Sequence, residues 1–290
     1  MKPTATHIKT NKLDTSDIPG ILPIGIKPLI MGVVNVTPDS FSDGGQFYDT
    51  DEAIRHGYRL AAEGADIIDI GGESTRPGAG AVSIDEELER VLPVIDGLAG
   101  KIDIPISIDT RKSEVAEKAC RAGAMIINDI SGLNHDPKIA DVAREHDSFL
   151  ILMHMRGTPA TMQQNLHYDD LIGEISLFLK AAAEKAIGRG VNKEKIIIDP
   201  GIGFGKTVEH NFSIIKNVAG FARLGYPVMI GASRKSFIGK TLDLPVEQRL
   251  EGSLAAAIMA VLNGASIVRA HDVAATSNAL KIVEKIIGAG

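Results

Sequence analysis

LIMGVVN (residues 29–35) is a short, almost continuous apolar run that ends at the polar residue Asn35. A run of this kind is typical of a parallel β-strand that is covered on both faces. Seven further runs of the same character follow it, and each ends in a polar or glycine-containing cluster. They are DIIDIGG (66–72), IPISIDT (104–110), AMIINDI (124–130), FLILMHM (149–155), KIIIDPG (195–201), PVMIGAS (227–233) and SIVRAHD (266–272). The repetition predicts eight parallel strands.

The segments between these runs carry helical patterns. Between the second and third runs, Leu88, Val91 and Ile95 share one helical face, and Ser83 with Glu86 has the spacing of a capping box. Successive runs begin roughly 20 to 50 residues apart, which leaves room for a crossover helix in each interval. Eight such units predict a single (β/α)8 barrel of the TIM type, with a doubly wound open sheet as the structural alternative.

The chain is interpreted as one domain with a short extension. Residues 1–28 precede the first unit and are predicted to be an N-terminal extension, and residues 29–290 the barrel domain. No linker rich in Gly, Ser or Pro indicates a second domain. The length of 290 residues suits a barrel of this type.

Composition excludes several classes of partner. Lys and Arg number 31 against 37 Asp and Glu, so the net charge of −6 disfavours nucleic acid. No basic amphipathic stretch suits a membrane surface, and no run of about 18 apolar residues predicts a membrane span. The N-terminus lacks the apolar core of a signal peptide. Because the single Cys120 cannot form an internal disulfide, we expect a cytoplasmic protein.

Polar side chains follow every predicted strand. In a barrel the carboxyl ends of the strands converge on one face, where active sites are assembled. Any one of these residues could be a helix cap or a solvated turn, but eight clusters together favour a site. The clusters include Asn35, Glu73 to Arg76, Asp109, Asn128 and Asp129, His154 and Arg156, Asp199, Ser233 to Lys235, and Arg269 with His271 and Asp272.

Two sets of residues within these clusters point to different ligand groups. One set contains donors or cations that suit a polyphosphate: Arg76, Lys235, Arg269 and His271. The other set contains carboxylates and an amide that suit a neutral heterocycle rich in N–H groups: Asp109, Asn128 and Asp199. The alternative for the second set is a network of salt bridges with the neighbouring Lys and Arg side chains.

Two glycine-rich segments lie just after predicted strands. NVTPDSFSDGGQF (35–47) and GGESTRPGAGAV (71–82) are predicted to be mobile loops that close over a ligand. The alternative, ordinary connections between strand and helix, is disfavoured by their length. By contrast, GIGFGKT (201–207) is not a Walker A loop, because Pro200 stands where the first Gly is required.

Seven motifs, in order, resemble those of bacterial dihydropteroate synthases. The resemblance runs from about Leu29 to the C-terminus, and several of the motifs are long and specific. The motifs are NVTPDSFSDGG (35–45), DIGGESTRPG (69–78), ISIDT (106–110), NDISG (128–132), DPGIGFGK (199–206), GASRKSFIG (231–239) and RAHDV (269–273).

The resemblance implies roles for individual residues. The pterin ring would be held by Asp109, Asn128, Asp199 and Lys235, with apolar walls from Phe204 and Met153. The diphosphate would be surrounded by Asn35, Arg76, Arg269 and His271, with Asn35 also contacting Mg²⁺. Asp43 would help the first loop position the leaving group and metal, Thr75 would border the site, and Ser236, Phe41 and Pro77 would lie near the aminobenzoate. The candidate catalytic residues are Asp43, Arg76, Lys235, Arg269 and His271.

The resemblance also implies the reaction. A member of this family condenses p-aminobenzoate with 6-hydroxymethyl-7,8-dihydropterin diphosphate, a step of folate biosynthesis. Diphosphate leaves largely before the arylamine attacks, so the site needs stabilised leaving-group charge and a dry pocket more than a strong base. A homodimer and binding of sulfonamides, which mimic aminobenzoate, are further expectations.

Two alternative functions share the barrel and the pterin pocket. A methyltransferase acting on methyltetrahydrofolate would need neither the two long loops nor the diphosphate cations, and methyl transfer to a corrinoid carrier would identify it. A non-catalytic pterin-binding paralogue would be favoured by replacement of Lys235, Arg269 or the loop residues, all of which are present.

Overall fold

The structure, a computed structural model, describes residues 27–37, 50–74, 78, 80–164 and 166–289. Each of the eight apolar runs contains a β-strand, as predicted from the sequence. The strands are β1 (Leu29–Asn35), β2 (Ile67–Gly71), β3 (Ile106–Asp109), β4 (Ala124–Asp129), β5 (Phe149–Met153), β6 (Ile196–Asp199), β7 (Met229–Ile230) and β8 (Ile267–Ala270).

All eight strands are parallel and belong to one sheet. Their order is β6-β5-β4-β3-β2-β1-β8-β7. Each pair of adjacent strands in this order is also consecutive in the chain, except that β1 pairs with the last strand, β8. A parallel bridge between Ile198 and Val228 joins the two ends of this order. The circle is therefore completed, which confirms the (β/α)8 barrel and excludes the open sheet.

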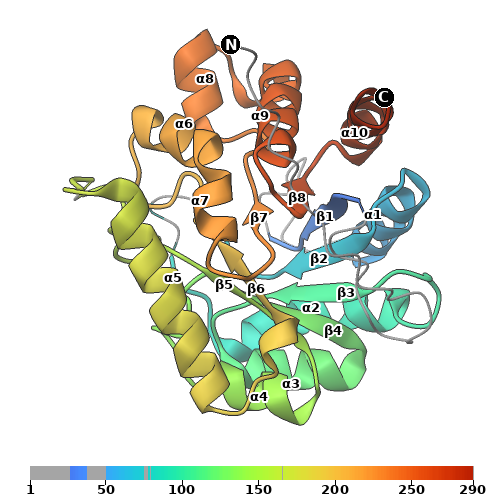
Figure 1. The fold of residues 1–290 in the computed structure, drawn as a ribbon. Helices are drawn as coiled ribbons and strands as arrows, with labels where there is room; N and C mark the ends of the chain where they lie inside the picture. The colour runs from blue at the N-terminus through green and yellow to red at the C-terminus, as the bar shows by residue number, and fades with distance from the viewer. Residues whose placement is uncertain (1–26, 38–49, 75–77, 79, 165, 290) are drawn as a thin grey trace, which may run out of the picture.

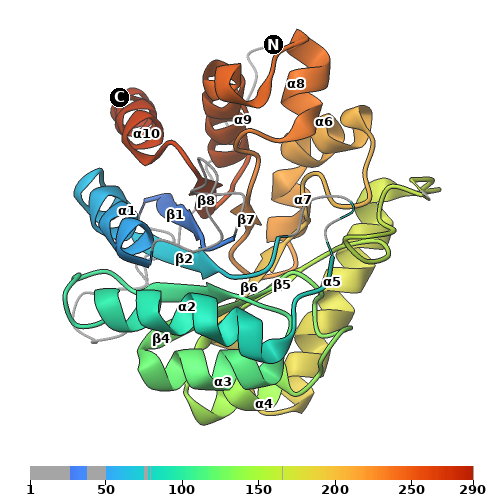
Figure 2. The same ribbon diagram turned by 180° about the vertical axis from the view of Figure 1, so that it is seen from behind.

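Helices surround the strands on the outside of the barrel, as Figure 1 and the view from behind in Figure 2 show. They are α1 (Thr50–Ala62), α2 (Ile84–Leu98), α3 (Ser113–Ala122), α4 (Ile139–Glu145), α5 (Leu171–Gly188), α6 (Val208–Lys216), α7 (Val218–Ala222), α8 (Ser236–Leu242), α9 (Leu250–Leu262) and α10 (Val273–Ile287). Two short 3-10 turns, η1 (Lys193–Lys195) and η2 (Val246–Gln248), interrupt the connections. No helix in these described stretches is both long and apolar enough to cross a bilayer.

Helix α2 begins where the sequence predicts. The Ser83 side chain accepts a hydrogen bond from the backbone N–H of Glu86, which satisfies one free donor of the first turn. The Glu86 carboxylate instead pairs with Arg90 one turn later. Leu88, Val91 and Ile95 are buried against the barrel, as their helical spacing requires.

Side chains alternate between the two faces of each strand, and this alternation decides what fills the barrel. Toward the amino ends of the strands the inward positions form an apolar floor: Leu29, Met31, Ile67, Ile126, Phe149, Ile151, Ile197, Met229 and Ile267. Two residues further along, the inward positions become mostly polar: Asp69, Asn128, Asp199 and Arg269. The carboxyl end of the barrel is thus a polar chamber on an apolar floor.

Candidate active site

Arg269 lies at the centre of a hydrogen-bonded network that spans the chamber. From β8, its Nε donates to Asp69 on β2 at 2.7 Å, and its terminal nitrogen donates to Asp109 on β3 at 3.0 Å. The same Asp69 oxygen accepts from the Asn128 amide on β4 at 3.1 Å. Four strands therefore contribute to one network. Asp109 therefore forms a salt bridge, the alternative considered for it on sequence grounds.

Three polar atoms of this region remain buried without a partner. They are Asp69 Oδ1, Ser107 Oγ and Asn128 Oδ1, for which no group among the described residues is within hydrogen-bond reach. All three side chains point inward from adjacent strands β2, β3 and β4. Because leaving a buried polar atom unpaired costs about 1–3 kcal/mol, such atoms indicate a place where a ligand or water is bound.

The carboxylates of the chamber hold their protons unusually tightly. Burial and the neighbouring Asp69 charge together raise the pKa of Asp109 to about 7, against the opposing effect of Arg269. Burial also raises the pKa of Asp199 to about 6, although the Gly201 N–H donates to it at 2.6 Å. Both groups therefore change charge in the physiological range.

Lys235 supplies the second cation, just before α8. Its ammonium lies 4.1 Å from the centroid of the Phe204 ring, a cation–π contact. Burial and repulsion by Arg269 lower its pKa to about 8, against the opposing effects of Asp199 and Asp109. Lys235 is therefore largely charged at neutral pH and acts electrostatically on both carboxylates.

The loop after β6 is shaped by close packing against the end of β5. Gly201 has a φ of +71°, and a Cβ there would collide with the carbonyl oxygen of His154. Lys206 is buried beneath the loop and donates to the Phe204 carbonyl at 2.8 Å and to His154 Nδ1 at 3.0 Å. Burial lowers the pKa of Lys206 to about 7. These contacts fix the Phe204 ring beside Lys235.

His271 follows β8 and is a neutral group. Burial, together with the cations Arg269, Arg234 and Lys235, lowers its pKa to about 3. Its Nδ1 lies 3.1 Å from the Ser233 hydroxyl. It can therefore contribute a hydrogen bond to an anion at neutral pH but not a positive charge, so within the predicted set of donors and cations it is a donor.

Comparison with known proteins gives a consistent result. Residues 31–271 match the family described as pterin binding enzyme. The chain is 49% identical over 263 residues to the dihydropteroate synthase of Synechocystis sp., covering 90% of this chain and 91% of that protein. This chain belongs to the dihydropteroate synthase family.

Solved structures of this family share the whole fold. A Yersinia pestis dihydropteroate synthase in a sulfonamide drug complex is 44% identical, with a TM-score of 0.86 over 91% of this chain and 95% of that chain. A Xanthomonas albilineans dihydropteroate synthase with 4-aminobenzoic acid has the same identity, TM-score and coverage. As a dihydropteroate synthase family member, the chain is a transferase.

The residues that the resemblance assigned to the pterin meet at one end of the barrel. Asp109 and Asn128 join through Arg269 and Asp69, and Asp199 and Lys235 influence one another electrostatically. Met153 and Phe204 belong to one small apolar cluster at this end of the barrel. Their roles in binding remain predictions.

The remaining predicted residues fall into two groups. Asn35 is half-buried at the end of β1, and Ser236 is exposed at the first position of α8. Five lie outside the described residues, together with most of the first loop: Phe41, Asp43, Thr75, Arg76 and Pro77. Of the predicted donors and cations, the structure therefore describes the cations Lys235 and Arg269 and the neutral His271.

Two site residues of this dihydropteroate synthase family member were missed from the sequence. Asp69 lies within the apolar run 66–72, and Lys206 within a glycine-rich loop. Strand alternation could have found Asp69, because it shares the inward face with Ile67 and Gly71. Nothing in the sequence pattern marks Lys206 as buried.

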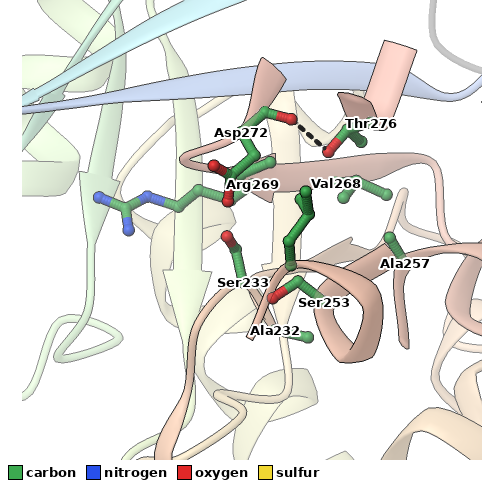
Figure 3. Close-up of a pocket in the computed structure, with 10 residues that line it drawn as sticks. Ala232, Ser233, Ser253, Ala257, Val268, Arg269, Asp272 and Thr276 are labelled. Atoms are coloured by element: carbon green, nitrogen blue, oxygen red, sulfur yellow. Dashed lines mark hydrogen bonds between the residues drawn. The ribbon is translucent and has the colours of Figure 1, made fainter. Parts of the chain in front are cut away.

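A small cavity of about 10 Å³ lies behind β8, between that strand and α9, and has room for about one water molecule. Figure 3 shows Val268 and Ala257 around it, while the Arg269 side chain extends away from them. The cavity therefore belongs to the barrel wall, and the functional side of β8 is the opposite face.

Proposed function

We propose that this chain condenses p-aminobenzoate with 6-hydroxymethyl-7,8-dihydropterin diphosphate to give 7,8-dihydropteroate and pyrophosphate, in folate biosynthesis. The observation that carries the proposal is the polar chamber, in which Asp109, Asn128 and Asp199 face the cations Arg269 and Lys235. The similarity to dihydropteroate synthases across nearly the whole chain supports it.

The chamber suits a pterin by its hydrogen-bonding groups. A pterin ring presents N–H donors beside lone pairs, and Asp109 and Asp199 are acceptors when ionised. The Asn128 amide donates to Asp69, so its free Oδ1 is available to accept from the ligand. A ring seated here would satisfy oxygens that are otherwise buried without partners.

The diphosphate would leave under the influence of fixed positive charge. Lys235 and Arg269 are partly buried, and in such a site a cation stabilises a developing oxyanion better than in bulk water. His271 would add a neutral hydrogen bond. The bond from the pterin methylene carbon to oxygen breaks first, and the arylamine lone pair then forms the new C–N bond, with one proton lost from the nitrogen.

A Mg²⁺ ion fits this arrangement through Asn35. The part of the chain that the structure describes holds no cluster of three or more His, Cys, Asp or Glu side chains suited to a metal. Mg²⁺ is commonly held by one or two protein oxygens together with substrate phosphates and water. We propose that the Asn35 amide oxygen supplies such a contact, and that the ion would neutralise charge on the leaving diphosphate.

The decisive experiment is a steady-state assay of pyrophosphate release with the purified protein. Release that requires p-aminobenzoate, the pterin diphosphate and Mg²⁺ is expected. Absence of release at saturating substrates would refute the enzyme and favour a non-catalytic pterin-binding protein. A parallel assay of methyl transfer from methyltetrahydrofolate to a corrinoid carrier is expected to be negative.

Binding of the pterin diphosphate is expected to depend on pH in a bell shape. Ligand N–H groups bind ionised carboxylates, and the pKa of Asp109 is raised to about 7 and that of Asp199 to about 6. Ionisation of Asp109 alone should therefore raise the affinity for the pterin diphosphate about tenfold between pH 5.5 and pH 7. Above pH 8 it should fall as Lys235 loses its proton.

Isothermal titration calorimetry across this range measures the effect. Asp109→Asn is the control, because it keeps the shape of the side chain and removes its titration. A wild-type affinity that is flat from pH 5.5 to pH 7 would contradict the assignment of these carboxylates to the pterin site.

We further propose a homodimer, a cytoplasmic location and binding of sulfonamides at the aminobenzoate position. Five large apolar side chains are exposed on α9 and α10 and support association through these helices: Met259, Leu262, Ile282, Ile286 and Ile287. Light scattering is expected to give twice the chain mass of 30.8 kDa. A mass of one chain at micromolar concentration would rule the dimer out.

The single Cys120 suits a reducing compartment, which supports the proposed cytoplasmic location. The Yersinia pestis relative was solved with a sulfonamide, which supports the proposed sulfonamide binding.

A further inference from the structure

Asp69 is a completely buried carboxylate that contacts both a cation of the chamber, Arg269, and an amide of the chamber, Asn128. One of its oxygens accepts from Arg269 Nε at 2.7 Å and from the Asn128 amide at 3.1 Å. Its side chain is 0% exposed. A buried carboxylate is expensive unless it is paired, and an apolar residue would fill this inward position of β2 more simply. Its presence therefore indicates a purpose other than packing.

The contact with Arg269 fixes the direction of the guanidinium. With Nε held by Asp69 and one terminal nitrogen held by Asp109, the planar group cannot rotate about its long axis. These two bonds use two of its five N–H donors, and the remaining donors lie in the same plane. Figure 3 shows the Arg269 side chain extended away from Ser253 and Ala257, which lie on α9.

The contact with Asn128 fixes which end of the amide faces the ligand. A carboxylate only accepts hydrogen bonds, so the amide nitrogen must face Asp69 and the amide oxygen must face elsewhere. That oxygen is buried, and nothing in the described part of the chain bonds to it. Asp69 thereby selects an acceptor for the pterin side of the site.

We propose that Asp69 is a positioning residue that orients the Arg269 guanidinium toward the diphosphate and the Asn128 amide oxygen toward the pterin. The inference rests on the proposed function and adds a residue that does not itself touch the substrate. One carboxylate thus couples the anion side of the site to the heterocycle side.

Because Asp69 is charged, the proposal can also be tested through the pKa of its neighbour Asp109. Asp109 is faced by Asp69 from β2, Arg269 from β8, Glu87 from α2 and Lys235 from the loop before α8. After burial, the Asp69 charge is the largest cause of the raised pKa of Asp109. Removing that charge should lower the pKa of Asp109, because its ionised form loses a repulsive neighbour.

The test is Asp69→Asn, compared with the wild type in steady-state assays from pH 5.5 to pH 8.5. We expect kcat/KM for the pterin diphosphate to fall by about tenfold or more at pH 7.5, with KM for p-aminobenzoate changed less than about twofold. The acid limb of the kcat/KM profile should move to lower pH. Unchanged kcat/KM and an unmoved acid limb would overturn the proposal.

Asp129→Asn is the matched control for loss of a buried carboxylate. Asp129 lies on β4, which is separated from β2 by β3. It is also 0% exposed, and it bonds to the backbone of Ser131 and Leu133 and not to the chamber. We expect a lower melting temperature with the acid limb in its wild-type position. If this variant moved the limb as Asp69→Asn does, the shift would be a general effect of destabilisation and the proposal would fail.

Two further measurements complete the design. In an Arg269→Ala background, Asp69→Asn should change kcat/KM far less than it does alone, and additive effects would contradict action through Arg269. A crystal structure of the wild type with pyrophosphate, which needs no variant to fold, should retain the Arg269 Nε contact with Asp69, and its loss would overturn the proposal. An inactive wild type would refute the proposed function, whereas an active wild type with an equally active Asp69→Asn would refute this inference alone.

Discussion

Replacing Arg269 with alanine is expected to destabilise the protein by about 3 kcal/mol and to lower kcat/KM by about a hundredfold or more. The side chain pairs with two carboxylates, Asp69 and Asp109, of which Asp69 is 0% exposed and Asp109 is 13% exposed. Without Arg269, two neighbouring negative charges would face each other in a site from which water is largely excluded. The same substitution removes a cation proposed to stabilise the leaving diphosphate.

The loss of stability should grow with pH. In the variant the pKa of Asp109, already raised to about 7, loses the lowering effect of Arg269 and rises further above that of the unfolded chain, so the native state binds more protons than the unfolded state. Stability must then decrease as pH rises through that window. Chemical denaturation at pH 6 and pH 8 measures the difference, and we expect the larger loss at pH 8.

Arg121→Ala provides the matched control. Arg121 lies on α3 and pairs with Glu117 one turn away, but its side chain is 72% exposed. An exposed pair of this kind contributes about 0.5 kcal/mol or less. Equal destabilisation by the two substitutions would show that the ion pairs of Arg269 contribute no more to the stability of the fold than an exposed pair does.

The barrel could be predicted from the sequence because the features that indicate each strand lie within one short stretch of the chain. Each parallel strand is buried on both faces, so it appears as an apolar run, and the polar residues after it mark its carboxyl end. The run 227–233 nevertheless yields only the two residues Met229–Ile230 of β7. The neighbouring Val228 completes the barrel through a single bridge to Ile198. The length of a strand depends on its partners and is therefore not contained in its own sequence.

The site could be predicted only in part, because charge state and pairing depend on contacts between distant residues. Asp69 and Arg269 are 200 positions apart, and no local pattern indicates that they meet. His271 belongs to the predicted set of donors and cations, and only its burial and the neighbouring cations, which lower its pKa to about 3, show that it is a neutral donor. The candidates Asp43 and Arg76 lie outside the described residues, so their proposed contacts with the leaving group stay predictions.

Replacing Lys235 with methionine is expected to lower kcat/KM for the pterin diphosphate by about a hundredfold. Methionine keeps an apolar stem of similar length, so packing over Gly203 and against the Phe204 ring is largely preserved while the charge is removed. Lys240→Met, at an exposed position on helix α8, which begins directly after Lys235, is the control and should retain wild-type activity. Equal activity of the Lys235 variant and the wild type would show that the ammonium is not part of the site.

The kinetics of Lys235→Met also separate its two proposed roles. If the ammonium chiefly contacts the pterin ring, affinity for a pterin without diphosphate falls together with kcat/KM. If it chiefly stabilises the leaving group, that affinity is preserved and kcat falls. Because Lys235 lowers the pKa of both Asp109 and Asp199, its removal should also shift the acid limb to higher pH. This shift is opposite in sign to that expected for Asp69→Asn, since one variant removes a positive neighbour and the other a negative one. Two substitutions in one chamber that move the same titration in opposite directions cannot both act through a general loss of structure.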